Sequence, residues 1–248
     1  MEVNSAALFF REGTEECVHG EATAKQGGTM IKGVLFDMDG TMLDTEPISM
    51  ACWRKSAAHF DITIDDELMD TFFGKNLVAI EEILRNAFGI DEEAVKIVEG
   101  RQVYYRAYLE EHGAPLKPGL IEILEYLKSK KIPAVVCTST DKVTGEKLLK
   151  KVGVYDYFDD FIYGDMVTRS KPDPQGFLMA AEAIGKNPAE CLVVEDSPNG
   201  VLAGKASSGY VIFVPDKIAL PADVKEGITA EMVSLHAIIP WIEKENSV

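Results

Sequence analysis

Two aspartates separated by one residue follow a short apolar run, residues 34–36, near the start of the chain. Phosphoryl transfer to a carboxylate needs one acid as nucleophile and a second acid that protonates the leaving alkoxide and later activates water. Asp37 and Asp39 suit these two roles. Gly40 allows the backbone to turn sharply, and Thr41 offers a hydroxyl or an amide to phosphate oxygens. Because the same string also occurs as an ordinary turn after a strand, other motifs have to support the interpretation.

Two hydroxyl residues and a lysine add groups that bind phosphate. Thr138 and Ser139 end a second apolar run, residues 135–137, and precede a helical stretch. Hydroxyls and amides at a helix N-terminus bind phosphate, although Ser or Thr there also serves as a plain N-cap. Lys171 precedes Pro172, whose ring stiffens the backbone and would hold the ammonium in a fixed direction. A solvated surface lysine is the alternative reading of this Lys-Pro pair.

A pair of adjacent acids, Glu195 and Asp196, follows the apolar run 192–194. Acids at the end of a buried strand are costly unless they are paired or bind a metal. Hard oxygen ligands beside a phosphate favour Mg²⁺. We therefore expect Asp37, the backbone carbonyl of Asp39 and Asp196 to hold Mg²⁺, with Glu195 acting through a water molecule.

The charge and composition of the chain argue against nucleic acid as a partner and against a membrane span. The formal net charge is −16, and no basic cluster with interleaved aromatic residues is present, so nucleic acid is not expected as a partner. No apolar stretch approaches the roughly 18 to 20 residues that a membrane span needs. The four scattered cysteines lack a CxxC pair and are typical of core thiols in a reducing compartment. These features favour a cytoplasmic protein, and together with the motifs they favour a small phosphate ester as its partner. A monomer or weak homo-oligomer is expected, with the oligomeric state left open.

Strand-like and helix-like segments alternate along most of the chain. Buried apolar runs that predict strands lie at 34–37, 134–137, 161–163, 191–194 and 210–214. Helical stretches lie between them at 120–130, 143–151, 174–184 and 198–206. This order predicts an α/β, Rossmann-like, doubly wound parallel sheet. Because the carboxyl ends of parallel strands share one edge, the sheet would bring the four motifs together.

One long segment, residues 45–117, interrupts this alternation. It offers no convincing strand, and its apolar residues recur along one helix face, as at Ile80, Ile83, Leu84 and Phe88. We predict an all-helical cap inserted into an α/β core formed by residues 30–44 and 118–248. A cap joined at the carboxyl edge of the sheet acts as a lid over the site. Residues 1–29 lack a repeating apolar pattern and are predicted to be a disordered extension, with the docking of a partner as the alternative.

The four motifs, in this order and with a helical insertion after the first, resemble those of the haloacid dehalogenase superfamily of phosphatases. The resemblance covers the chain from about Met30 to its C-terminus. It implies the cofactor Mg²⁺ and roles for five residues: Asp37 as nucleophile, Asp39 as general acid and base, Thr138 and Lys171 as phosphate binders, and Asp196 as metal ligand.

Within that superfamily, the runs 44–47 and 195–200 are similar to the branch of β-phosphoglucomutase and sugar-phosphate phosphatases. The mutases carry a histidine in the first cap helix, where this chain has Ser49, and an arginine for a second phosphate, which Lys75 replaces only in part. The resemblance thus implies hydrolysis of a sugar phosphate or similar monoester. A sugar-phosphate mutase is the alternative, and a non-catalytic sensor of a phosphorylated metabolite is a further one that the intact acids at Asp37, Asp39 and Asp196 disfavour.

Overall fold

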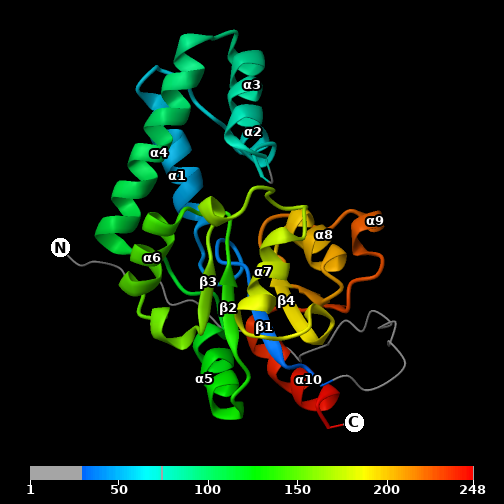
Figure 1. Ribbon diagram of the computed structural model, residues 1–248. Coiled ribbons are helices and arrows are strands. Elements are labelled where there is room, and N and C mark those ends of the chain that lie inside the picture. The colour runs from blue at the N-terminus through cyan, green and yellow to red at the C-terminus, as the bar shows by residue number, and fades with distance from the viewer. Residues whose placement is uncertain (1–29, 74, 248) are drawn as a thin grey trace, which may run out of the picture.

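The computed structural model describes residues 30–73 and 75–247, so the predicted extension at 1–29 lies outside the described residues. A parallel sheet with the strand order β3-β2-β1-β4-β5-β6 forms its centre (Figure 1). The strands are β1 (Gly33–Phe36), β2 (Ala134–Cys137), β3 (Asp160–Ile162), β4 (Cys191–Glu195), β5 (Tyr210–Phe213) and β6 (Ala230–Glu231). The order places β1 in the middle, where its end is flanked by the ends of β2 and β4.

Helices cover both faces of the sheet, which explains why its strands are continuous apolar runs. Alternate strand residues point to opposite faces: Phe36 belongs to one buried cluster and Leu35 to the other. The Phe36 cluster includes residues of α5 (Leu120–Lys130), α6 (Lys142–Lys151) and α10 (Ile238–Glu245). The Leu35 cluster includes residues of α7 (Gln175–Ala183), α8 (Pro198–Ala206) and α9 (Ala222–Lys225). Short 3-10 turns lie between these elements at Tyr155–Tyr157, Gly164–Met166, Pro188–Glu190 and Leu235–Ala237.

Side-chain caps fix the starts of two helices at the edge of the sheet where β2 and β4 end. The carboxylate of Asp141 accepts a hydrogen bond from the backbone N–H of Thr144 in α6. The hydroxyl of Ser197 accepts one from the backbone N–H of Gly200 in α8. Each cap satisfies a donor that the first helical turn leaves unpaired, and so holds the preceding strand-to-helix loop in place.

Four helices form a separate body above one edge of the sheet (Figure 1). They are α1 (Glu46–Ala58), α2 (Asp66–Asp70), α3 (Leu77–Phe88) and α4 (Glu92–His112), and they enclose their own buried cluster around Trp53 and Leu84. The two linkers to the core run side by side, since Leu43 forms an isolated antiparallel bridge with Leu116. The predicted fold class, a doubly wound parallel sheet with an inserted helical cap, is confirmed, while the domain boundaries at 45 and 117 stay a prediction.

Two further expectations concern the core and the membrane. Cys52, Cys137 and Cys191 are buried and free, as expected of core thiols, whereas Cys17 lies outside the described residues. Over the ranges that the structure describes, no helix combines the length and apolar character needed to cross a membrane.

Candidate active site

The strand register determines which residues meet at the carboxyl edge of the sheet. Phe36, the last residue of β1, is aligned with Val136 of β2 and Val194 of β4. Asp37 directly follows β1 in the chain and is buried. It therefore stands between the ends of two neighbouring strands, where the sheet itself holds its backbone: the N–H of Asp37 donates to the carbonyl of Val194 at 3.0 Å.

Lys171 links the ends of these three strands. Its ammonium donates to Oδ1 of Asp37 at 2.5 Å, to Oε1 of Glu195 at 2.7 Å and to the backbone carbonyl of Cys137 at 3.0 Å. Its side chain is only 13% exposed. Three acceptors match the three protons of an ammonium, so Lys171 is held in one direction. The residue predicted from the Lys-Pro motif thus lies in the centre of the site and not on a solvated surface.

Three carboxylates gather beside Lys171. Asp37, Glu195 and Asp196 each contribute an oxygen atom, and these atoms lie within 4.8 Å of one another. Thr41 is buried, and its hydroxyl donates to Oδ1 of Asp196 at 2.9 Å. The second oxygen of Glu195 accepts hydrogen bonds from the backbone N–H groups of Asp196 and Ser197 at 3.0 and 3.1 Å. Glu195 is therefore bonded at both oxygens.

The charges of this cluster do not balance, because three acids face one ammonium. Burial raises the pKa of Asp37 to about 8 against the opposing charge of Lys171, and the carboxylate of Glu195 adds to the rise. Burial and the carboxylates of Asp37 and Glu195 likewise raise the pKa of Asp196 well above its ordinary value. Burial acts to lower the pKa of Lys171, but the two acids that it contacts hold it well above 10.5. The cluster thus has an excess of negative charge, which a bound cation would offset.

A divalent cation fits this imbalance. Fully ionised, the cluster carries a net charge of about −2, and all its side-chain donors are hard carboxylate oxygens. Mg²⁺ prefers such ligands and needs only one or two carboxylates from the protein. Asp37 and Asp196 are the better-suited pair, because Glu195 already accepts bonds from Lys171 and from two backbone N–H groups.

Asp39, the second acid of the first motif, points to a different set of partners. Its Oδ2 accepts a hydrogen bond from the hydroxyl of Thr140 at 2.8 Å, and its Oδ1 lies 3.5 Å from the hydroxyl of Tyr105 on α4. The side chain of Asp39 does not belong to the cluster of three carboxylates within the described part of the chain. The two acids of the motif therefore have separate environments, one beside a lysine and one beside two hydroxyls.

The hydroxyl residues after β2 border a small cavity. Its volume is about 60 Å³, and Thr138, Ser139 and Lys171 are among the residues that line it. Thr138 is buried, and its hydroxyl oxygen accepts a hydrogen bond from the backbone N–H of Thr140 at 3.0 Å. The motif predicted to bind phosphate therefore lies next to the lysine that contacts Asp37.

Lys75 is the one predicted phosphate-binding residue that the structure does not bring to this group. It is exposed on the link between α2 and α3. Within residues 30–73 and 75–247, no side-chain hydrogen bond or ion pair joins it to another site residue, so its role stays a prediction. Thr140 and Tyr105 are the contacts that sequence reasoning missed. Thr140 belongs to the same motif as Thr138, but no local signal connects Tyr105, a helical residue with neighbouring tyrosines, to Asp39.

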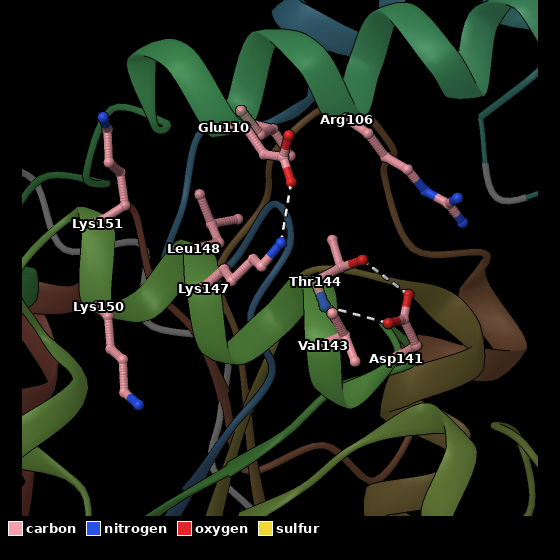
Figure 2. A pocket seen from close by; sticks show the side chains of 10 residues that line it. Arg106, Glu110, Asp141, Val143, Thr144, Lys147, Leu148, Lys150 and Lys151 are labelled. Carbon is pink, nitrogen blue, oxygen red and sulfur yellow. Dashed lines mark hydrogen bonds and ion pairs between the residues drawn. The ribbon is translucent and has the colours of Figure 1, made fainter.

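A second cavity lies away from the carboxylates, in a groove of about 830 Å³ between α4 and α6. Figure 2 shows Glu110 of α4 facing Lys147 of α6, with an oxygen–nitrogen distance of 3.1 Å. Arg106 of α4 also lines the groove. None of the predicted site residues borders it. The groove is therefore a contact zone between the cap and the core, and the candidate active site is the smaller, charged region at the end of the sheet.

Comparisons with known proteins identify relatives of this chain. Residues 31–208 match the family model of the haloacid dehalogenase-like hydrolases. The chain is 30% identical over 181 residues to the phosphorylated carbohydrates phosphatase of Thermotoga maritima, covering 71% of this chain and 82% of that protein. It is 31% identical over 207 residues to hexitol phosphatase A of Escherichia coli, covering 84% and 91%. Its fold is similar to that of β-phosphoglucomutase from Clostridium difficile, with a TM-score of 0.70 at 24% identity over 88% of this chain and 98% of that one. The chain belongs to the haloacid dehalogenase-like hydrolases.

Proposed function

We propose that this hydrolase is a Mg²⁺-dependent phosphatase that removes phosphate from a sugar phosphate or a similar small monoester through an aspartyl-phosphate on Asp37. The observation that carries the proposal is the environment of Asp37, a buried carboxylate in contact with Lys171 and grouped with Asp196. Two relatives at 30 and 31% identity, named as phosphatases of phosphorylated carbohydrates and of hexitols, support the substrate class.

In the first step, a carboxylate oxygen of Asp37 attacks phosphorus, and the bond from phosphorus to the ester oxygen breaks. Asp39, protonated at this stage, gives its proton to the leaving alkoxide. In the second step a water molecule loses a proton to Asp39 and attacks the same phosphorus, which releases phosphate and restores Asp37. The hydroxyls of Thr140 and Tyr105 are placed to hold Asp39 in position between these two transfers.

Charge on the phosphoryl group has to be balanced as the first bond forms. Lys171 supplies one fixed positive charge, and the hydroxyls and amides of Thr41, Thr138 and Ser139 supply donors for phosphate oxygens. Mg²⁺, when bound by Asp37, Asp196 and the backbone carbonyl of Asp39, supplies two further charges. Glu195 serves mainly to hold Lys171, since both of its oxygens already accept hydrogen bonds.

The test is phosphate release from a panel of sugar phosphates, hexitol phosphates, nucleotides and 4-nitrophenyl phosphate, with Mg²⁺ or with EDTA. We expect release with Mg²⁺ and a loss of nearly all activity with EDTA, restored by added Mg²⁺. Equal rates with and without the metal would contradict the role of the acidic cluster. Conversion of a sugar 1-phosphate to its 6-phosphate without net release would instead identify a mutase, because the phosphoryl group would then return to a sugar.

A glycine beside the metal ligands offers a structural test of the same proposal. Gly40 has a φ of +84°, and a Cβ at this position would lie 2.2 Å from Oδ2 of Asp196. Gly40→Ala is therefore expected to displace that carboxylate and to weaken the activation by Mg²⁺ by about 10-fold or more. Strain in the left-handed region adds a loss of stability of roughly 1 to 2 kcal/mol. Titration of activity against Mg²⁺ and unfolding by urea measure the two effects.

Gly89 provides the matched control. It also has a positive φ, of +64°, but a Cβ there would have nothing within 4 Å among the described residues. Gly89→Ala should thus show the loss of stability without the change in Mg²⁺ dependence. If both variants need the same Mg²⁺ concentration as the unmodified protein, the position of Asp196 has no influence on the metal and its assignment as a ligand is wrong.

A cytoplasmic location remains part of the proposal. Its support is that the three described cysteines are buried thiols without disulfides, which suits a reducing compartment.

A further inference from the structure

Arg101 on α4 is a largely enclosed cation in the cap that has no acidic partner. One terminal nitrogen, Nη2, donates to the hydroxyl of Ser49 on α1 at 2.6 Å. The guanidinium carbon lies 4.3 Å from the ring centre of Tyr105 and 5.3 Å from that of Trp53. Its Nε is buried without a hydrogen-bond partner, and among the described residues no ion pair joins the guanidinium to a carboxylate. An enclosed charge left in this state costs stability, which favours a role in binding.

Glu46 on α1 is the acidic counterpart of Arg101 and does not touch it. Its half-buried carboxylate makes no side-chain hydrogen bond or ion pair within the described ranges. Burial raises the pKa of Glu46, the charges of Asp216 and Asp39 add to the rise, and the charge of Arg101 opposes it. Glu46 lies one helical turn before Ser49, the residue that Arg101 contacts, so the two charges are neighbours, although no ion pair joins them among the described residues.

Both groups border the side of the active site that faces the cap. Tyr105, one helical turn after Arg101 and stacked against it, brings its hydroxyl to 3.5 Å from Asp39. Glu46, at the start of α1, lies three residues after Leu43, which forms an isolated bridge with Asp39. In the proposed mechanism Asp39 protonates the leaving oxygen, so the rest of the leaving group has to lie near Asp39 and under the cap.

We propose that Arg101 and Glu46 together bind the leaving group of the substrate, and that this group is an uncharged polyol rather than one that carries a second phosphate. The inference rests on the proposed phosphatase function. A guanidinium only donates hydrogen bonds and a carboxylate only accepts them, whereas a hydroxyl does both and can bond to each. A second phosphate, with a charge near −2, would be placed beside Glu46 and Asp39 with one guanidinium to offset it. Ser49 and the two aromatic rings hold Arg101 in place.

The test compares kcat/KM for fructose 1-phosphate, fructose 1,6-bisphosphate and 4-nitrophenyl phosphate. The first two probes differ by one phosphate group, and the third has a leaving group without alcohol hydroxyls. For Arg101→Met we expect the ratio of kcat/KM for fructose 1-phosphate to that for 4-nitrophenyl phosphate to fall by about 10- to 100-fold, as for the loss of a charged hydrogen bond. A purely structural role would lower both values together and leave the ratio unchanged, which would overturn the inference.

Arg106→Met is the matched control. Arg106 is on the same helix but is exposed and lines the groove between α4 and α6 (Figure 2), so its loss should leave the ratio unchanged. Glu46→Gln tests independently whether the charge of Glu46 disfavours a second phosphate. Removing its charge should raise kcat/KM for the bisphosphate relative to fructose 1-phosphate by several-fold.

The outcomes separate this inference from the function on which it rests. If the unmodified protein hydrolyses none of the three esters, the phosphatase proposal itself fails at this substrate class. If it hydrolyses them but prefers the bisphosphate, and Arg101→Met removes that preference, Arg101 binds a second anion and the assignment of an uncharged leaving group is wrong. An unchanged ratio of bisphosphate to monophosphate in Glu46→Gln would also contradict the part assigned to Glu46.

Discussion

Replacing Asp37 with asparagine is expected to lower kcat for phosphate release by at least about 10³-fold, the scale on which enzymes lose activity with their nucleophile. The amide keeps the size of the side chain but does not provide the carboxylate oxygen that forms the bond to phosphorus. The measurement is the initial rate at saturating substrate and Mg²⁺. In parallel, acid quenching with labelled substrate should trap phosphate on the unmodified chain and none on the variant.

Asp66→Asn is the control for this experiment. Asp66 lies at the exposed start of α2, and its carboxylate pairs with Arg54, away from the site. Its loss should leave kcat unchanged. Activity of Asp37→Asn above about a tenth of the normal value, with deamidation excluded by mass spectrometry, would remove Asp37 from the mechanism.

Asp37→Asn also tests whether burial and the neighbouring carboxylates raise the pKa of Asp37. The pKa of this carboxyl is about 8 in the folded protein against an ordinary value of 3.8. Between these values the folded protein keeps a proton that the unfolded chain has released. The free energy of unfolding of the metal-free protein should therefore fall as the pH rises from about 4 to about 8. Urea unfolding in EDTA at several pH values should show that the free energy of unfolding falls less steeply with pH for Asp37→Asn than for the unmodified protein. Equal slopes would contradict the raised pKa of Asp37.

Lys171→Met is expected to destabilise the metal-free protein by roughly 3 to 5 kcal/mol, the usual cost of removing one partner from a buried ion pair. The variant leaves Asp37 and Glu195 facing each other without the shared ammonium. Methionine retains an unbranched side chain that can pack near Phe177, over whose ring the ammonium now lies. Urea unfolding measures the loss, and we also expect phosphatase activity to fall sharply because the phosphoryl charge loses its fixed cation.

Two variants make this result specific. Lys32→Met removes an exposed pair with Glu190 and should cost no more than about 1 kcal/mol. Adding Glu195→Gln to Lys171→Met removes one of the stranded charges and should recover part of the lost stability while activity remains low. A Lys171→Met protein that is as stable as Lys32→Met would mean that the buried ion pair does not hold the strand ends together.

The strands β1 to β5 and four helices of the core were predictable from the sequence, because each left a local signal, while the roles given to the site residues stay predictions. Continuous apolar runs gave the central strands to within a residue, and the predicted helices at 120–130 and 198–206 coincide with α5 and α8. The site followed from topology, since polar residues at the ends of parallel strands must meet at one edge. The last strand and the last two helices were not predicted. β6 and α9 are only two and four residues long, too short to leave a periodic pattern, and α10 was missed as well.

Which residues of the cap face the core depends on how the cap helices pack. Tyr105 approaches Asp39, and Arg101 binds Ser49 across two helices, although all three cap residues read as ordinary helical positions. Lys75, predicted from the cap segment 73–77, is exposed, and its role stays a prediction. The reason is physical: periodicity reports which side of a helix is apolar, but the orientation of α1 and α4 over the sheet is set by the packing of the cap's own core. That packing joins residues about fifty positions apart, and no local pattern records it.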